Sequence, residues 1–305
     1  NQDGNDAREL RRQLESFNVQ PDPAAVKFAW PHLNSSDRYI RYAARMAVER
    51  NPVEEWQSKA LAEKHPDAAF TALLALARLG TAEAQPALLK ALALFSFADL
   101  TEEQTLSKLR VIEVSIARHG VPTSDVARQV IADVDLLSPA IDESVNRELC
   151  QILIALDAPN AVSRTVALLK AAPTQEEQIT YAVSLRNAKT GWSPDLRRSY
   201  MSWWNAGRSD KHPTRVTQWF ADAGLRFNNG ASFANFMAHA HEEAKFTMTP
   251  DEIIALADVL AEYDILHPAK QPYIPGPPRE LVKEWVTADL QPLLEKIGSG
   301  RNFGR

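Results

Sequence analysis

The strings that repeat along this chain are ALLKA at residues 87–91 and 167–171, AL at 75–76 and 155–156, and ARLG at 77–80, which returns as ARHG at 117–120. The first two matches lie eighty positions apart and the third lies forty apart, so all three fit one step of forty residues. This step is typical of proteins built from stacked helix pairs. Each pair in such a protein buries its apolar face against the next pair. The repeats therefore predict an α-solenoid.

The segments around the repeats carry helical signals. They are filled with Ala, Leu, Glu, Gln and Arg, which are strong helix formers. Helix-start signals recur at 51–54 (NPVE), 101–104 (TEEQ), 174–177 (TQEE) and 249–252 (TPDE). Glycines at 80, 120 and 191 are typical of helix ends. Because no alternating run of β-branched and aromatic residues predicts a strand, we expect an all-α fold.

Residues 37–48 (DRYIRYAARMAV) resemble the second helix of a HEAT repeat, with its acid, apolar residue, Arg, small Ala positions and final apolar pair. Alanines let neighbouring helices approach closely, and an acid at the start of a helix stabilises it. We therefore expect an irregular HEAT/armadillo-like α-solenoid (an α-α superhelix) over residues 20–191. A lead-in helix or linker is expected at residues 1–19.

The C-terminal third differs in composition. Residues 192–247 hold four of the seven tryptophans, which predicts an aromatic-rich helical cap over 192–267. Four prolines in residues 272–278 exclude a helix or an inner strand there. Residues 268–305 are therefore expected to form a Pro-rich extended strap, a last helix near 279–297 and a C-terminal linker. Because both ends of the chain resemble loops, we expect it to be a piece of a longer one.

Composition excludes several classes of function. The 305 residues carry a formal net charge of −5, which leaves no excess of cations to neutralise nucleic acid. The single cysteine excludes an internal disulfide. No run of 18 apolar residues occurs, so no membrane span is expected. No Cys-x-x-Cys-His haem site, phosphate loop or calcium loop is present, and no cofactor is expected in this chain.

Three arginines are candidate binding residues. Arg38, Arg41 and Arg45 are three and four positions apart, so they line one stripe of a helix. Along a concave groove this stripe would grip an anionic partner. The alternative is that the arginines form ion pairs between repeats, with acids such as Asp37 and Glu49.

A second candidate site lies in residues 195–204 (DLRRSYMSWW), where the core stripe is expected to run through Leu196, Tyr200 and Trp203. Trp204 falls one step away from this stripe. Arg and Trp are frequent energetic hot spots at interfaces, so an exposed Trp204 would be an interface residue, and a buried one would belong to the core. The candidate binding residues here are Trp204, Arg197 and Arg208.

No residue is predicted to be catalytic or to bind a metal. His239 and His241 are two apart, so on a helix they point about 200° apart and cannot bind one ion. Cys150 lies in an apolar stretch (LCQILI, 149–154), which favours a buried small hydrophobe over a nucleophile. The pairs of adjacent acids mostly fall in first helical turns, where they favour the helix dipole.

Several segments resemble a family of large secreted proteins of the planctomycete and verrucomicrobial type. These proteins fuse a dehydrogenase-like β-propeller, a HEAT-like helical region and a C-terminal c-type haem domain, and this chain resembles the helical region. The segments that carry the resemblance are RRQLE (11–15), FAWP (28–31), RYIRYAAR (38–45), GWSPDLRR (191–198), YIPGPPR (273–279) and GRNFGR (300–305). The resemblance implies a periplasmic or exported setting, with haem only in a flanking domain and redox chemistry outside these residues.

Three hypotheses for function follow. The first is a non-enzymatic α-solenoid scaffold, excised from a larger exported redox protein, whose partners are flanking domains of the parent chain or another protein. The second is a helical enzyme, carbohydrate-active or hydrolytic, with a site in residues 192–247; an aromatic cleft with two facing carboxylates would favour it. The third is a freestanding peptide-binding repeat protein, favoured by an exposed groove of apolar and Arg residues.

Overall fold

The computed structural model describes residues 2–206 and 231–266. Its first helices are α1 (Gln2–Ser16), α2 (Pro23–Ala29), α3 (Arg38–Glu49), α4 (Val53–Ala62), α5 (Pro66–Leu79), α6 (Gln85–Ala93) and α7 (Glu102–His119). They are followed by α8 (Ser124–Val134), α9 (Glu143–Ala155), α10 (Ala161–Ala171), α11 (Gln175–Leu185), α12 (Pro194–Ala206), α14 (Ala231–Phe246), α15 (Pro250–Ala255) and α16 (Ala257–Leu266). Short 3-10 turns are η1 (Trp30–His32), η2 (Ala82–Ala84), η3 (Phe97–Asp99) and η4 (Asp135–Leu137). No strand occurs in either described range, so the all-α prediction is confirmed there.

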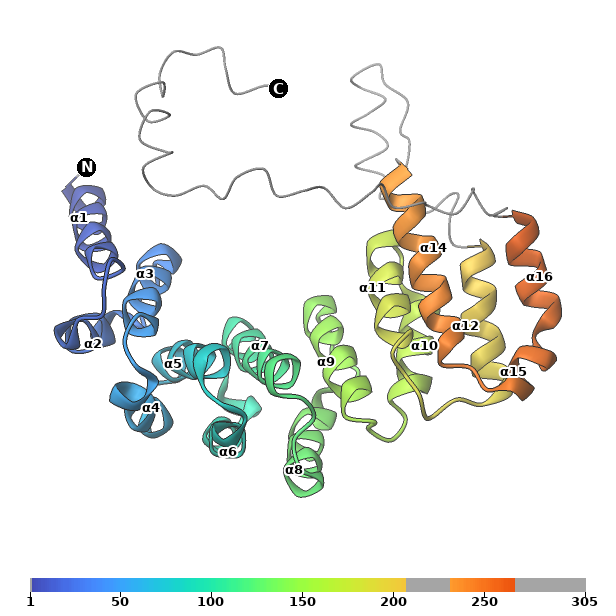
Figure 1. The fold of residues 1–305 in the computed structure, drawn as a ribbon, viewed down its shortest axis with the longest axis horizontal. Coiled ribbons are helices and arrows are strands. Elements are labelled where there is room, and N and C mark those ends of the chain that lie inside the picture. The colour runs from blue at the N-terminus through green and yellow to red at the C-terminus, as the bar shows by residue number, and fades with distance from the viewer. Residues whose placement is uncertain (1, 207–230, 267–305) are drawn as a thin grey trace, which may run out of the picture. The chain divides into compact units, whose positions relative to one another are not determined.

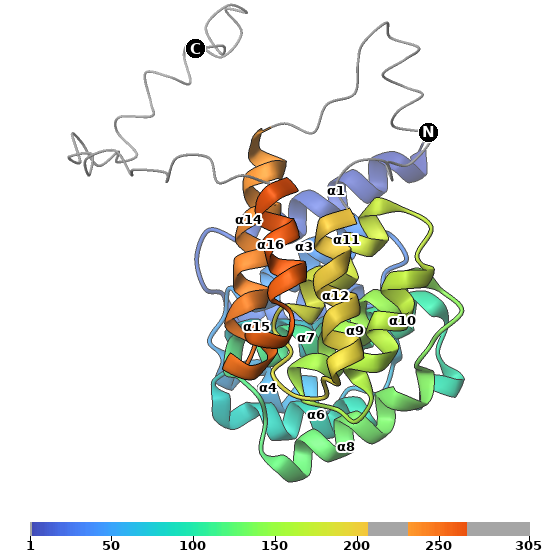
Figure 2. The same cartoon turned by 90° about the vertical axis from the view of Figure 1, so that its right-hand side faces the viewer.

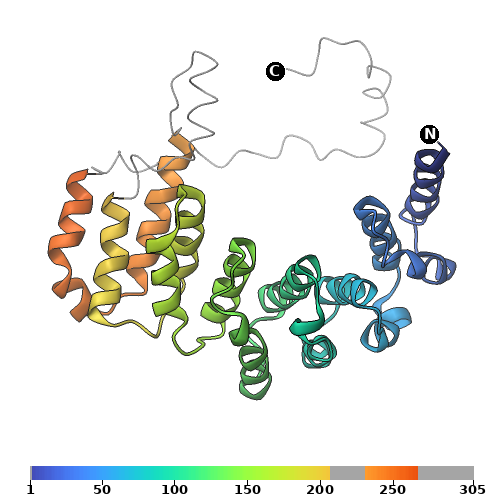
Figure 3. The same ribbon diagram turned by 180° about the vertical axis from the view of Figure 1, so that it is seen from behind.

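The helices before α12 form two layers (Figure 1). The upper layer contains α1, α3, α5, α7, α9 and α11, and each of these helices contacts the next. The lower layer contains α4, α6 and α8, which also contact one another in order. Figure 3 shows the same layers from behind, with α4 below α5 and α6 below α7. The observed fold is therefore an α-solenoid-like row of helix pairs, as the repeats predict.

The forty-residue step corresponds to one helix pair. Helices α5 and α7 end at Gly80 and Gly120, whose amides donate to the carbonyls of Leu76 and Ile116. A side chain ties one pair to the next: the amide nitrogen of Gln85, at the start of α6, donates to the carbonyl of Gly120 at 2.9 Å. Gly191 lies several residues beyond α11, at a φ of 79°, so it does not cap that helix.

The core of the row depends on small side chains. Helix α5 contacts α3, α4, α6 and α7, and it can do so because it presents alanines on several sides. Its buried alanines are Ala68, Ala69, Ala72, Ala75 and Ala77. Leu73 and Leu76 of the same helix are also buried, and each contributes about 1.5–3 kcal/mol through the removal of apolar surface from water.

The expected helix caps form at three of the four positions. Thr101 and Thr249 build capping boxes with Gln104 and Glu252, and the Thr174 hydroxyl accepts from the amide of Glu177. The prediction for residues 51–54 is wrong, because α4 has Pro52 at its N-cap and no side-chain cap. The Asn51 side chain instead donates to the carbonyl of Ala47, in the preceding helix.

Helices α12, α14 and α16 lie side by side at the end of the row (Figures 1 and 2). The chain divides into two units, Asn1–Tyr263 and Asp264–Arg305, and only residues 264–266 of the second are described. The predicted strap and final helix of residues 268–305 lie outside the described residues. No helix in the described ranges is long and apolar enough to cross a membrane.

Candidate functional site

The free face of the upper layer carries two adjoining hollows. The first, of about 490 Å³, is lined by residues of α3, α5, α7 and α9. The second, of about 400 Å³, is lined by residues of α7, α9 and α11 and of the turn that follows α11. Arg110 lines both hollows, and we call them together the groove.

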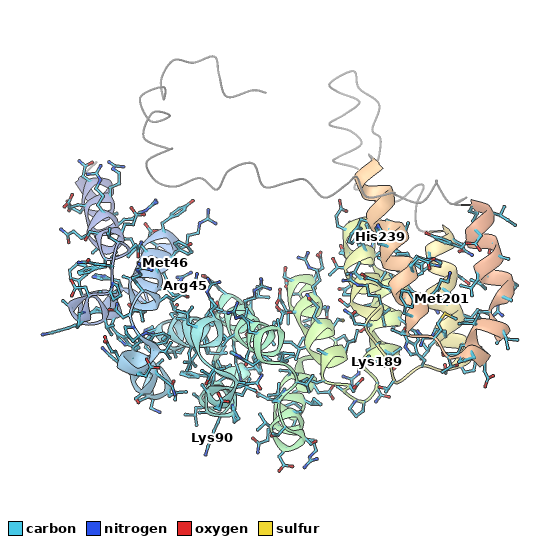
Figure 4. All side chains as sticks on the ribbon, viewed as in Figure 1. Arg45, Met46, Lys90, Lys189, Met201 and His239 are labelled. Atoms are coloured by element: carbon cyan, nitrogen blue, oxygen red, sulfur yellow. The ribbon has the colours of Figure 1, made fainter. Side chains whose placement is uncertain are left out.

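The three predicted arginines of α3 all line the first hollow. The α3 stripe points this way because Ile40, Ala43 and Ala47 turn the opposite side of the helix into the core. Asp37 forms no ion pair with a described arginine; its carboxylate caps α3 by accepting from the amides of Tyr39 and Ile40. Figure 4 shows Arg45 on this upper layer and Lys90 projecting from the lower one.

Arg41 and Arg45 form ion pairs, as one of the two interpretations predicts. Arg41 Nη2 donates to Glu103 Oε1 of α7 at 3.0 Å, which links two helix pairs. Arg45 Nε lies 3.4 Å from Glu49 Oε1, one turn further along α3. Pairing between repeats is therefore found for Arg41, with Glu103 instead of the acids named from the sequence, whereas the Arg45 pair lies within α3 and links no repeats.

Glu49 is shared between two guanidinium groups. Its carboxylate is 5% exposed and lies 3.1 Å from Arg78 Nε as well as 3.4 Å from Arg45 Nε. Burial raises the pKa of Glu49, although both arginines act in the opposite direction. Burial also lowers the pKa of Arg45, an effect that Glu49 opposes and Arg78 adds to. One positive charge of this trio has no carboxylate of its own.

Two carboxyl groups meet where the hollows adjoin. Glu113 of α7 lines the second hollow and Glu148 of α9 lines the first. Glu113 Oε1 and Glu148 Oε2 are buried without an N–H or O–H donor among the described residues, and a proton held between them satisfies both. Burial, together with the hydrogen bond and charge of Glu148, raises the pKa of Glu113 to about 8. At neutral pH Glu113 is therefore largely protonated.

The second predicted site is not an exposed surface. Trp204 and Arg197 are each 1% exposed, so Trp204 belongs to the core and the interface prediction is wrong for both residues. The buried stripe of α12 runs through Arg197, Tyr200, Met201 and Trp204. His241 of α14 packs on Trp204, Glu252 of α15 binds Arg197, and Tyr200 donates to the carbonyl of Ala182 in α11. Trp203 is only partly buried. Arg208 lies outside the described residues.

Arg197 holds the end of the row together. Its guanidinium lies 3.9 Å from the centre of the Trp192 ring and donates from Nε to Glu252 Oε1 at 3.1 Å. It also donates to the hydroxyl and carbonyl oxygens of Thr247, at 3.1 and 3.0 Å. Burial lowers the pKa of Arg197, and the hydrogen bond to Glu252 opposes that shift. These contacts join α12 to the corner between α14 and α15.

His239, His241 and Cys150 do not line the groove. His239 is exposed and His241 is buried, so the two histidines point to different sides of α14. No group of three or more potential metal ligands occurs in the described residues. Cys150 is buried, and burial raises the pKa of its thiol to about 11, which keeps it protonated and unreactive.

The comparisons with known proteins do not add to this description. No protein-family model matches the chain, and neither a curated protein nor a solved structure matches it.

Proposed function

We propose that this chain is a non-enzymatic scaffold that binds a segment of a partner protein along the groove. The observation that carries the proposal is that two adjoining hollows cross five successive upper-layer helices, α3 to α11, on their free face. Leu74 and Leu106 supply apolar surface in the first hollow, which four arginines also line. Such a mixture of apolar, tyrosine and arginine side chains is characteristic of protein interfaces.

The tyrosines of α3 strengthen the proposal. Tyr39 and Tyr42 are 54% and 58% exposed, and their rings lie 4.8 and 5.3 Å from the guanidinium carbons of Arg38 and Arg45. A tyrosine ring that stacks on an arginine restrains that arginine before a partner arrives. Binding then costs less side-chain entropy.

The enzyme hypothesis for residues 192–247 has less support. The described part of that region lines neither hollow of the groove. The carboxyl pair that the structure brings together, Glu113 and Glu148, lies outside that region and shares a hydrogen bond. Glycoside hydrolases hold their two carboxyl groups about 5–9.5 Å apart, with room for a sugar and water between them.

Photo-crosslinking from within the groove tests the scaffold proposal. p-Benzoylphenylalanine is placed at Tyr42, in the first hollow, and for comparison at Leu94, which is 65% exposed and ends α6 in the lower layer. We expect the Tyr42 position to form a crosslink, in the cells that make the protein, to one protein segment identified by mass spectrometry. The identified segment must then bind the purified chain in isothermal titration. Equal crosslinking from both positions, or none from Tyr42, would refute the groove as the binding surface.

We also propose, from the resemblance alone, that the chain belongs to a larger exported redox protein whose haem lies in a flanking domain. The intact mass of the natural gene product and a haem absorbance scan of the same sample test this. A mass far above 33.9 kDa with covalent haem supports the connector role. A mass near 33.9 kDa without haem leaves the freestanding peptide-binding protein as the form of the scaffold.

A further inference from the structure

The groove has the opposite charge balance to the whole chain. The chain has a formal net charge of −5. The first hollow, in contrast, is lined by Arg38, Arg41, Arg45 and Arg110 and by only three acids, Asp67, Glu103 and Glu148. The positive charge of the first hollow therefore comes from the residues that line it and not from the net charge of the chain.

The acids of the first hollow are already satisfied by neighbouring side chains. Asp67 accepts from Gln104 Nε2 at 3.1 Å, and Glu103 accepts from Arg41 at 3.0 Å. Glu148 lies within hydrogen-bond reach of Glu113, a carboxyl group that burial keeps largely protonated and that can therefore donate to it. These three acids leave little negative potential to repel an anionic partner.

Among the residues that the structure describes, two arginines of the same hollow have no carboxylate of their own. Arg38 is exposed, and its hydrogen bond is to the Tyr39 hydroxyl at 2.8 Å. Arg45 shares Glu49 with Arg78, and its Nε atom is buried without a hydrogen-bond acceptor among the described residues. The Arg45 side chain is nevertheless 12% exposed and stacks on Tyr42, so it is held in place beside the hollow.

We propose that the groove binds an acidic segment of the partner protein, with carboxylates of that segment bound by Arg45 and Arg38. A guanidinium group presents paired N–H donors that match a carboxylate, and its hydrogen bonds to that anion are roughly twice as strong as neutral ones. This inference rests on the proposed scaffold function and names the chemistry of the partner.

A protein segment fits the groove better than a nucleic acid. Leu74 and Leu106 offer apolar surface in the first hollow, which suits the non-acidic side chains of a peptide and which a phosphate backbone does not use.

Fluorescence anisotropy with labelled peptides tests the proposal. The probes are hexaglutamate, hexaglutamine and hexalysine carrying one dye, and a dye-labelled oligothymidine of six nucleotides. We expect saturable binding of hexaglutamate that weakens as salt is raised, and much weaker binding of the other three probes. Equal binding of hexaglutamine, no binding of hexaglutamate, or tighter binding of the oligothymidine would overturn the inference.

Two variants locate the binding and one serves as a control. Arg45→Gln and Arg38→Gln should each weaken hexaglutamate binding about tenfold, the loss expected for one hydrogen-bonded charge pair. Arg128→Gln, which changes an exposed arginine paired with Asp125 on α8, should leave binding unchanged. Because Arg45 also contacts the buried Glu49, its variant is checked by urea unfolding. Arg38 is exposed, so Arg38→Gln decides the matter if Arg45→Gln fails to fold.

The failure of this inference can be told apart from failure of the scaffold proposal. A Tyr42 crosslink to a segment without acidic residues would keep the scaffold function and refute the acidic partner. Absence of both the crosslink and hexaglutamate binding would refute both proposals.

Discussion

Replacing Glu113 by glutamine removes a carboxyl group that the fold keeps protonated at neutral pH. Glu113 is 10% exposed, accepts from Arg110 Nη1 at 3.0 Å and shares a hydrogen bond with Glu148 of the neighbouring helix. A glutamine amide has nearly the same shape and can donate to Glu148, but it cannot ionise. We expect Glu113→Gln to change how the stability of the protein depends on pH, with no change in the fold.

The sign and size follow from the pKa of Glu113, which rises from 4.5 to about 8 on folding. Between these values the folded chain keeps a proton that the unfolded chain has lost. The free energy of unfolding therefore falls as pH rises, by up to about 1.4 kcal/mol per pH unit. From pH 5 to pH 7 the ionisation of Glu113 lowers the free energy of unfolding of the wild type by about 1–3 kcal/mol. The decrease is smaller if Arg110 stabilises the ionised carboxylate. The glutamine variant avoids this loss.

Urea unfolding followed by circular dichroism at pH 5, 6, 7 and 8 measures the effect. The matched control is Glu102→Gln, which makes the same chemical change at an exposed position in the first turn of the same helix, α7. We expect the free energy of unfolding of Glu113→Gln to rise relative to that of the wild type as pH increases. The Glu102→Gln control should keep a constant difference from the wild type. Parallel pH profiles for all three proteins would refute a proton shared by Glu113 and Glu148.

Three further predictions concern buried groups. Arg197→Ala should lower the free energy of unfolding by about 3–5 kcal/mol, because it breaks a buried ion pair with Glu252. Arg198→Ala breaks an exposed ion pair with Asp258 and should lower it by less than about 1 kcal/mol. Urea unfolding of the two variants compares these values. Lys108→Met should cost about 1–3 kcal/mol in the same assay, since it leaves Asp133 and the carbonyl of Phe95 without their donor, and a cost near zero would contradict this reading. Cys150 should react with a thiol reagent only after unfolding, because it is buried and its pKa is raised to about 11; rapid reaction of the native protein at pH 8 would contradict this.

Much of the fold could be predicted from local patterns. The forty-residue step predicted the relation of α5 to α7, because the two helices end at equivalent glycines. Helical spacing predicted that Arg38, Arg41 and Arg45 share one face, and the structure places all three beside one hollow. It also predicted that His239 and His241 point apart. These predictions use only the geometry of one helix or of one repeat.

The errors come from contacts between distant segments. Helical spacing within α12 put Trp204 outside the expected core stripe, and Trp204 was therefore considered as an exposed interface residue. The structure buries it because α14, some thirty residues later in the chain, brings His241 against its ring at 5.8 Å between centroids. The meeting of Glu113 and Glu148 could not be predicted either. Their contact depends on how α7 packs on α9, and no pattern within either helix records it.

Because α5 and α7 both end at a glycine, an evolutionary deletion between these two positions would remove one complete helix pair. A cut after Gly80 and another after Gly120 would remove forty residues and join α5 directly to the segment that begins α8. Each helix pair contacts mainly its neighbours, so the shortened row would keep matching surfaces at the new junction. The deletion would remove Arg110 and Glu113, and with them the boundary between the two hollows. Gain or loss of whole helix pairs would therefore lengthen or shorten the row of helices and the groove along it.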